Sequence, residues 1–157
     1  MDYDVQVYLL SQNFMNDYPK EQYPELMHKL GRPYSCLIVD THEDYLICIP
    51  FRSAIMHQNA YFFKDTERSK RSRSGLDYSK VVLLRDLEYL DSKKAVVDQD
   101  EYKDAIKHMD TIVHDIVCYI EQYVNHTNGT QRLHQREYAR KYQFSTLPYF
   151  HEMLGLA

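Results

Sequence analysis

The sequence has no tryptophan, four glycines and three cysteines, and each shortage excludes a class of protein. So few glycines leave no glycine-rich loop for a phosphate, and no Gly-x-Ser-x-Gly nucleophile elbow occurs. Cys36, Cys48 and Cys118 are odd in number and widely spaced, which argues against a disulfide framework and against a zinc site. We therefore expect unpaired, buried thiols in a reducing, cytoplasmic compartment.

Long apolar runs are also lacking. No segment approaches the roughly 20 apolar residues that span a bilayer, and the acidic start Met1-Asp2-Tyr3-Asp4 is unlike a signal peptide. His108 and His114 would lie on different faces of a helix, so we expect no metal and no cofactor. With 157 residues, 44% of them hydrophobic and 27% charged, the chain is predicted to form a single domain over residues 1–157 that does not enter a membrane.

Tyrosine is abundant, with 15 residues, and charge is unevenly placed although the net charge is −4. Most tyrosines are expected at the rim of the core, and the alternative is that some stack on unpaired bases. Residues 64–80 hold six basic and three acidic side chains, whereas residues 81–121 hold five basic and ten acidic ones. Because phosphate binding depends on where charge lies, we expect the acidic helix to face solvent and the basic loop to face RNA.

Apolar, β-prone segments dominate the first half of the chain. Strands are predicted at Val5–Leu10, Tyr34–Val39, Tyr45–Phe51, Ala60–Lys64 and Ser79–Leu84, with Leu87–Leu90 as an edge continuation. The polar turn Asp40–Asp44 indicates an antiparallel hairpin. The stretch Asp65–Gly75 is polar, basic and rich in serine, and is predicted to be a mobile loop.

The second half has helical periodicity. Apolar residues recur at helical spacing from Tyr102 to Val124, which predicts one long helix that Asn128-Gly129 ends. A weaker helix is predicted over 131–142, and Ser145 is expected to cap a last short one. Strands followed by helices indicate an α+β fold.

A compact set of chemically useful side chains follows the strand that ends at Phe51. Arg52 is a fork-shaped phosphate donor, Ser53 is a short hydroxyl donor, and His57 can transfer a proton near neutral pH. Metal-independent RNA cleavage needs such parts: a base, donors to the phosphate and an acid. The alternative is an ordinary loop start with a surface histidine.

The sequence resembles the TenpN family of toxins from type III toxin–antitoxin systems, which are similar to the ToxN and AbiQ endoribonucleases. The likeness is ordered along most of the chain and is most specific over residues 32–80. Its motifs are Arg32-Pro33-Tyr34, Ile49-Pro50-Phe51-Arg52-Ser53 with His57, Gly75-Leu76-Asp77-Tyr78-Ser79-Lys80, and Phe144-Ser145-Thr146-Leu147-Pro148-Tyr149-Phe150.

The resemblance implies a compact, strongly curved antiparallel sheet, as in the barrel-like MazF and CcdB toxins, with helices around it. It implies a metal-independent endoribonuclease that cuts cellular RNA and leaves a 2′,3′-cyclic phosphate and a 5′-hydroxyl. It also implies inhibition by a folded, repeat-encoded antitoxin RNA, which the toxin cuts from its precursor and then holds in an RNA-mediated hetero-oligomer.

Carried over by position, Ser53 matches the family's catalytic serine. Ile55 stands where ToxN carries a catalytic lysine. Because isoleucine cannot transfer a proton, the resemblance implies that His57 or Arg52 takes this role. Arg32 and Lys80 match family lysines, and with Arg52 they are predicted to grip the scissile phosphate. RNA contacts are predicted for Tyr34, Lys64, Arg68, Lys70, Arg71, Arg73, Tyr78, Arg132, Arg136 and Arg140.

Two other functions remain open at this point. The chain could be a catalytically inactive module that binds structured RNA through the same basic residues. It could also be a toxin that targets a protein, of the gyrase-poison type, because one fold hosts several functions.

Overall fold

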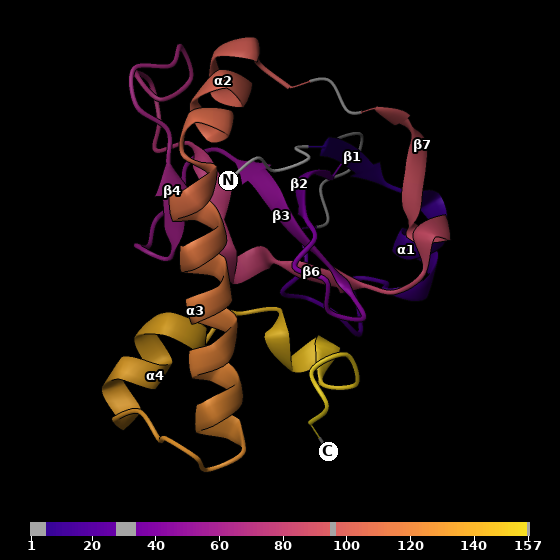
Figure 1. Cartoon of the computed structure of the whole chain (residues 1–157), viewed down its shortest axis with the longest axis vertical. Helices are drawn as coiled ribbons and strands as arrows, with labels where there is room; N and C mark the ends of the chain where they lie inside the picture. Colours follow the sequence, from indigo (N-terminus) through magenta and orange to yellow (C-terminus); the bar gives the residue numbers. More distant parts are fainter. Residues whose placement is uncertain (1–5, 28–33, 95–96, 157) are drawn as a thin grey trace.

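The computed structural model describes residues 6–27, 34–94 and 97–156, and within them the chain is an α+β protein, as predicted (Figure 1). Seven strands form one antiparallel sheet in the described residues. They are β1 (Gln6–Leu10), β2 (Ser35–Val39), β3 (Leu46–Arg52), β4 (Ala60–Phe62), β5 (Gly75–Asp77), β6 (Val82–Leu84) and β7 (Leu90–Lys94).

The sheet order is β4-β5-β3-β2-β1-β7, with β6 also paired to β3. The hairpin predicted around Asp40–Asp44 is confirmed, because β2 and β3 pair from Cys36 with Pro50 to Val39 with Ile47. β4 and β7 are the two ends of this order, and no pairing between them joins the described residues into a closed barrel.

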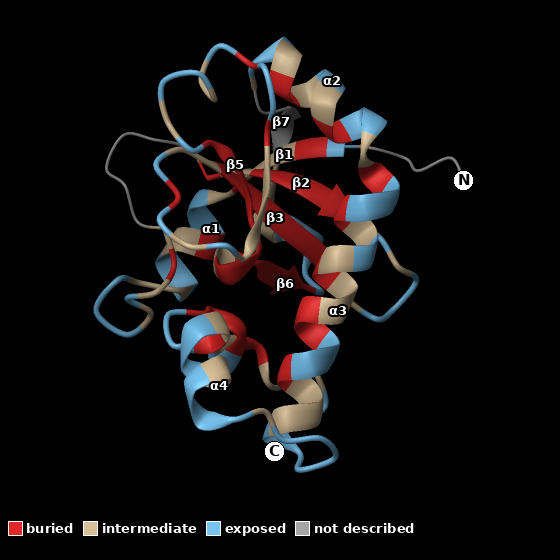
Figure 2. Cartoon of the chain, turned by 90° about the vertical axis from the view of Figure 1, so that its left-hand side faces the viewer, coloured by how far each residue is buried: buried red, intermediate tan, exposed pale blue. Residues whose placement is uncertain are grey.

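The three longer helices follow the sheet, whereas one short helix follows the first strand and two 3₁₀ turns lie between the later strands. They are α1 (Gln12–Asp17), α2 (Gln99–Lys107), α3 (Met109–Thr127) and α4 (Gln135–Tyr142), with the 3₁₀ turns η1 (Tyr78–Lys80), η2 (Leu87–Tyr89) and η3 (Leu147–Phe150). α3 runs beside the sheet with its buried side toward it (Figure 2). Its buried residues keep the helical spacing seen in the sequence: Met109, Ile112, Ile116, Tyr119, Ile120 and Tyr123.

The single long helix predicted from Tyr102 to Val124 is wrong, because it is divided at His108. The backbone of His108 has φ −117° and ψ 26°, outside the helical region. Its ring nitrogen Nδ1 lies 3.0 Å from the Asp104 carbonyl oxygen and 2.8 Å from Asp104 Oδ1, so the side chain bonds to the preceding turn. The predicted end at Asn128-Gly129 is confirmed: Asn128 is the C-cap, and Gly129 has a positive φ of 81°.

Gly75 allows β4 and β5 to approach each other closely. A Cβ atom at this position would lie far inside contact distance of the carbonyl oxygen of Tyr61 on the neighbouring strand. The contact is with backbone, which cannot rotate away as a side chain could. The loop that precedes β5 therefore has to end in glycine for the two strands to pair.

Replacing Gly75 with alanine is therefore expected to lower the free energy of unfolding by about 2 kcal/mol or more, the usual range for overpacking. Urea denaturation of Gly75→Ala against the parent measures this loss. Gly155→Ala is the matched control, since a Cβ there meets no atom within 4 Å and only its positive φ of 68° opposes alanine. An unchanged urea midpoint for Gly75→Ala would contradict the described strand pairing.

Candidate functional site

The candidate site lies where one edge of β3 changes its partner. β6 pairs with Leu46–Cys48, and β5 pairs with Phe51 and Arg52. Between β5 and β6 the chain leaves the ladder to form the turn η1, which corrects the prediction of a strand beginning at Ser79. Pro50, which has no amide hydrogen to donate, lies between these two pairings on this edge, while β2 pairs with it on the other edge. The interruption turns the side chains of Asp77 and Ser79 toward the end of β3.

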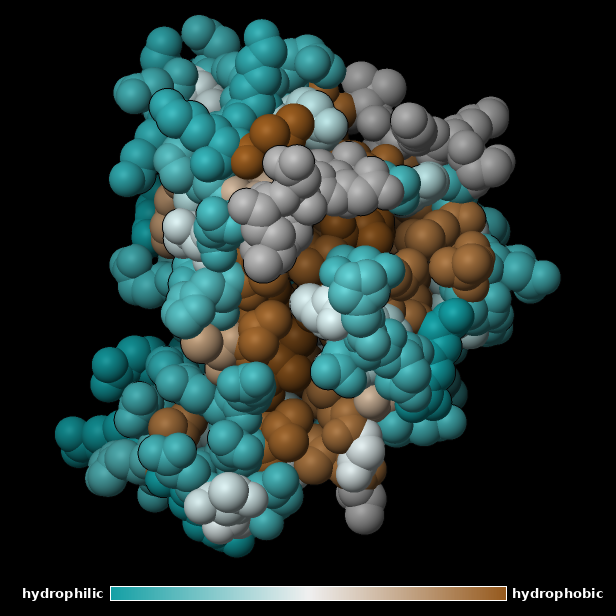
Figure 3. Space-filling model, in the orientation of Figure 1, coloured by the Kyte–Doolittle hydropathy of each residue, from teal (hydrophilic) through white to brown (hydrophobic). Residues whose placement is uncertain are grey.

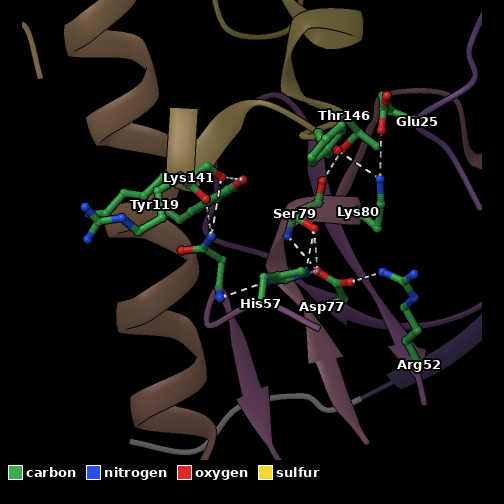
Figure 4. A network of polar contacts seen from close by, with 12 residues as sticks. Glu25, Arg52, His57, Asp77, Ser79, Lys80, Tyr119, Lys141 and Thr146 are labelled. Atoms are coloured by element: carbon green, nitrogen blue, oxygen red, sulfur yellow. Dashed lines mark hydrogen bonds and ion pairs between the residues drawn. The ribbon is translucent and has the colours of Figure 1, made fainter. Parts of the chain in front are cut away.

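Asp77 is the centre of this site (Figure 4). Its carboxylate is fully buried and accepts a hydrogen bond from Arg52 Nη1 at 2.7 Å. Its other oxygen accepts from the Ser79 hydroxyl at 2.6 Å and from the Ser79 amide at 3.0 Å. His57 Nε2 is 3.1 Å from the same oxygen. Three segments that are separate in sequence thus converge on one carboxylate.

This set of donors keeps Asp77 ionised. Burial raises the pKa of the Asp77 carboxyl, but the hydrogen bonds from His57 and Ser79, the nearby ring of His57 and the hydrogen bond from Arg52 together outweigh it. The net effect holds the pKa of Asp77 below its usual range. The buried charge is therefore paired with the Arg52 guanidinium, as a charge in the interior requires.

The hydrogen bonds of His57 define which nitrogen carries its proton. The backbone amide of Asn59 donates to Nδ1 at 2.9 Å, so this nitrogen must present a lone pair. The hydrogen of the neutral ring is then on Nε2, which is 3.1 Å from both Ser79 Oγ and Asp77 Oδ1. Both nitrogens are occupied by the protein, so the predicted role of His57 as acid or base does not match this conformation.

Asn59 ties the loop 53–59 to its surroundings on both sides. Its carbonyl oxygen accepts from the amide of Tyr78 in η1, and its side-chain amide donates weakly, at 3.4 and 3.5 Å, to the carbonyl oxygens of Arg140 and Lys141. The end of α4 therefore lies next to the His57 loop (Figure 4).

The three residues after Arg52 differ in exposure. Ser53 is partly exposed and makes no side-chain hydrogen bond to the described residues. Ala54 has a positive φ of 53°, which an alanine adopts at a cost of roughly 1–2 kcal/mol. Ile55 is fully buried, and its amide donates to the Arg73 carbonyl at 2.9 Å. The position where ToxN carries lysine is thus part of the core here.

Lys80 is largely buried, with 13% of its side chain exposed. Its ammonium donates to Glu25 Oε2 at 3.1 Å and to the Phe144 carbonyl at 2.9 Å. Around it, the Tyr34 hydroxyl donates to the Lys80 carbonyl, and the Thr146 hydroxyl donates to the carbonyl oxygens of Ser79 and Val81. Lys80 thus holds η1 against the C-terminal segment, and its charge is already matched by Glu25. The other predicted phosphate ligand, Arg32, lies outside the described residues.

The loop 64–73 packs on α2. Arg68 forms a two-pronged ion pair with the buried Glu101, both bonds 2.9 Å long, and the amides of Lys64 and Glu67 donate to Asp104 and Asp100. Thr66 and Ser69 also exchange hydrogen bonds within the loop. The acidic helix α2 therefore contacts the basic loop, which corrects the expectation that it faces solvent; RNA binding by the exposed side chains of this loop stays a prediction.

The residues predicted to contact RNA divide into two groups. Tyr34 and Tyr78 are buried, so neither ring is open to a base, and three basic side chains have partners: Arg68 on Glu101, Lys70 on Glu67 and Arg73 over the Phe62 ring. The exposed members of the set that make no ion pair or side-chain hydrogen bond within the described residues are Lys64, Arg71, Arg132, Arg136 and Arg140.

No role was predicted from the sequence for Asp77, Ser79 or Asn59 individually. Asp77 follows two buried residues in the short strand β5, and an acidic residue so placed is the one signal that could have found the site. Its side chain also caps η1 through the Ser79 amide, an arrangement that Asp-x-Ser favours.

Comparisons with protein-family models, with curated proteins and with solved structures found no match. Among the described residues, no helix is long and apolar enough to cross a membrane, and no three His, Cys, Asp or Glu side chains are grouped to hold a metal. A function for this chain has to be argued from the geometry around Asp77.

The hydrogen-bond pattern makes a spectroscopic prediction. In its neutral form, His57 should carry its hydrogen on Nε2, because the Asn59 amide occupies Nδ1. His108 should carry it on Nδ1, where it faces two Asp104 oxygens. Long-range proton–nitrogen NMR correlations distinguish these tautomers, with His108 as the internal control. A neutral His57 with its hydrogen on Nδ1 would contradict the hydrogen bond from the Asn59 amide to this nitrogen.

The charge of Asp77 predicts a pH-dependent contribution to stability. Asp77→Asn should lower the free energy of unfolding at pH 7 by about 3 kcal/mol, the cost of breaking a buried ion pair. Since the folded pKa is lowered, the stabilisation by the charge is present above the unfolded pKa of about 3.9 and is lost as pH falls through the folded value.

The difference in the free energy of unfolding between the parent and Asp77→Asn should therefore become smaller below about pH 4. Urea denaturation across this pH range measures it. Asp65→Asn, at an exposed carboxylate, should change stability by less than about 0.5 kcal/mol throughout. A difference that stays constant with pH would mean that Asp77 is not ionised in the native protein.

Proposed function

We propose that this protein is a metal-independent endoribonuclease, the toxin of a type III toxin–antitoxin pair, with its cleavage site at Arg52 and Ser53. The observation that carries the proposal is the state of Arg52. One nitrogen of its guanidinium is fixed on the buried Asp77, while 28% of the side chain remains exposed. Nε and Nη2 make no hydrogen bond within the described residues, so they are available to a phosphate.

The ion pair with Asp77 makes Arg52 a preorganised donor. A guanidinium whose direction is already fixed loses little conformational freedom when it binds an oxyanion, and it stabilises the charge that builds on phosphorus. Ser53 follows Arg52 directly in the chain, is partly exposed, and its hydroxyl makes no hydrogen bond to the described residues. In this scheme Arg52 neutralises the scissile phosphate, and Ser53 donates to it or orients the attacking 2′-hydroxyl.

Proton transfer has to balance the cleavage. The ribose 2′-oxygen attacks phosphorus and loses a proton, while the 5′-oxygen leaves and gains one. His57 can accept a proton only at Nδ1, after the Asn59 amide has released it. We therefore assign His57 to positioning in the conformation described, and to proton transfer only once the loop 53–59 has shifted.

Two exposed apolar side chains belong to segments that contact the site, and such side chains suit unpaired bases. Phe144 is 61% exposed, and its carbonyl oxygen is held by Lys80; Met56 is 86% exposed and precedes His57. An exposed aromatic ring next to a phosphate donor is a common arrangement for single-stranded RNA. The proposal thus places a base near Phe144 and its phosphate at Arg52.

The rest of the resemblance belongs to the same proposal. We infer a cytoplasmic toxin with the curved, MazF- and CcdB-like sheet, held inactive by a folded repeat antitoxin RNA in a hetero-oligomer. The antiparallel sheet and the helix beside it support this inference. The exposed arginines in and just before α4 are the natural contacts for that RNA: Arg132, Arg136 and Arg140.

One observation favours a second function, that of a module that binds structured RNA without cutting it. Both ring nitrogens of His57 and the buried Asp77 are hydrogen-bonded within the protein. A site with no uncommitted base suits binding better than proton transfer. The two functions share the same RNA contacts and differ only in whether the RNA is cut.

The experiment is incubation of the purified protein with total RNA in EDTA, followed by analysis of the RNA ends. We expect fragments with 2′,3′-cyclic phosphate and 5′-hydroxyl ends. Ser53→Ala and Arg52→Lys should each lower the rate about a hundredfold, the effect of removing one donor to the transition state. Lysine at position 52 still provides a positive charge to pair with the buried Asp77. The Arg52→Lys variant should therefore fold, and a lower rate would reflect the lost guanidinium.

Arg85→Ala is the matched control, because Arg85 pairs with Asp44 and Glu152, outside the network around Asp77. It should cleave at the parental rate. RNA that is bound but left intact by the parent would support the second function. Equal cleavage by the parent, Ser53→Ala and Arg52→Lys would show that the site lies elsewhere.

A further inference from the structure

A cavity of about 290 Å³ opens between the β2–β3 hairpin, α3 and the C-terminal segment. Its volume is close to the lower end of small-molecule sites, roughly 300 Å³. The floor is apolar and is formed by Ile47, Val117, Ile120, Val124, Met153 and Leu154. Figure 3 shows an apolar groove on this face of the molecule, between two polar margins. None of the lining residues belongs to the network around Asp77.

The rim of the cavity is acidic. Glu43, Asp44 and Glu121 surround the opening, and all three are exposed. Asp44 is paired with Arg85 at 2.9 Å, and Arg85 also approaches Glu152 at 3.8 Å. Glu43 and Glu121 make no ion pair or side-chain hydrogen bond to the described residues, so two carboxylates of the rim are uncompensated.

The negative charge of the rim affects the pKa of the Tyr45 hydroxyl. Burial raises its pKa, and Glu43, Asp44 and Glu121 raise it further because an added negative charge is unfavourable there. Asn125 contributes a side-chain amide to the same wall, and Thr41 contributes a hydroxyl. An apolar floor with a few polar groups at one side is the usual construction of a ligand site.

We propose that this cavity binds a small amphipathic organic cation, an aliphatic or aromatic amine whose apolar body rests on α3 and whose ammonium faces Glu43 and Glu121. Charge complementarity selects this ligand class. A carboxylate or a phosphate would be repelled by the same rim, so the cavity is unsuited to RNA. A lysine side chain of a peptide presents similar chemistry, and a parallel titration with a short lysine-containing peptide separates these two sources.

The experiment is titration of the full chain with 4-phenylbutylamine, followed by the methyl NMR signals of Val117, Ile120 and Leu154. Saturable shifts at these methyl groups are expected in the millimolar range, as for a fragment-sized ligand. 4-Phenylbutanoic acid, with the same apolar body and the opposite charge, should not bind. Glu43→Gln and Glu121→Gln should each weaken amine binding roughly fivefold, the effect of one nearby charge in a water-rich setting.

Glu137→Gln, on α4 outside the cavity, is the matched control and should leave amine binding unchanged. Val117→Trp should fill the cavity and abolish amine binding. If Val117→Trp does not fold, Glu43→Gln and Glu121→Gln at the exposed rim still test the proposal. Equal binding of amine and acid, no saturable shift, or binding only of a lysine-containing peptide would each overturn the proposal. None of these results depends on RNA cleavage.

Discussion

The buried carboxylate of Asp77 is the constraint on which the candidate site depends. It joins the end of β3 through Arg52, the turn η1 through Ser79, and the following loop through His57. A charge removed from water must be paired and hydrogen-bonded, so the buried Asp77 holds Arg52 and Ser79 in place. Arg52 is therefore held rigidly, and its exposed donors have a defined direction before any ligand arrives.

The elements predicted well from the sequence are those that local pattern determines. The strands of the β2–β3 hairpin and the end of α3 at Asn128-Gly129 follow from alternation, turn residues and capping. The break at His108 and the turn at Tyr78–Lys80 did not follow from apolar spacing, because each involves a polar side chain bonded to its own neighbourhood: His108 to Asp104, and Asp77 to the Ser79 amide. The buried network of Asp77 did not follow either, because its partners Arg52 and His57 are more than 15 positions away.

The charge pattern shows the same limit. Counting charges along the chain correctly found a basic stretch and an acidic helix, but not that they bind each other. Arg68 on Glu101 and the backbone amides on Asp100 and Asp104 use much of that basic stretch within the fold. The uncommitted cations of the described residues lie in part beside the His57 loop instead, around α4.

These placements bear on how a protein of net charge −4 could hold RNA. Phosphate binding needs a local positive potential, and screening limits the reach of opposing charges to about 8 Å at physiological salt. The end of α4 contacts the His57 loop through Asn59, and Arg52 is joined to His57 through Asp77, whereas Glu43, Asp44 and Glu121 surround a cavity that shares no residue with the Asp77 network. An RNA bound at Arg52 would therefore leave the acidic cavity open. The two proposed sites share no residue, so each must be judged on its own contacts.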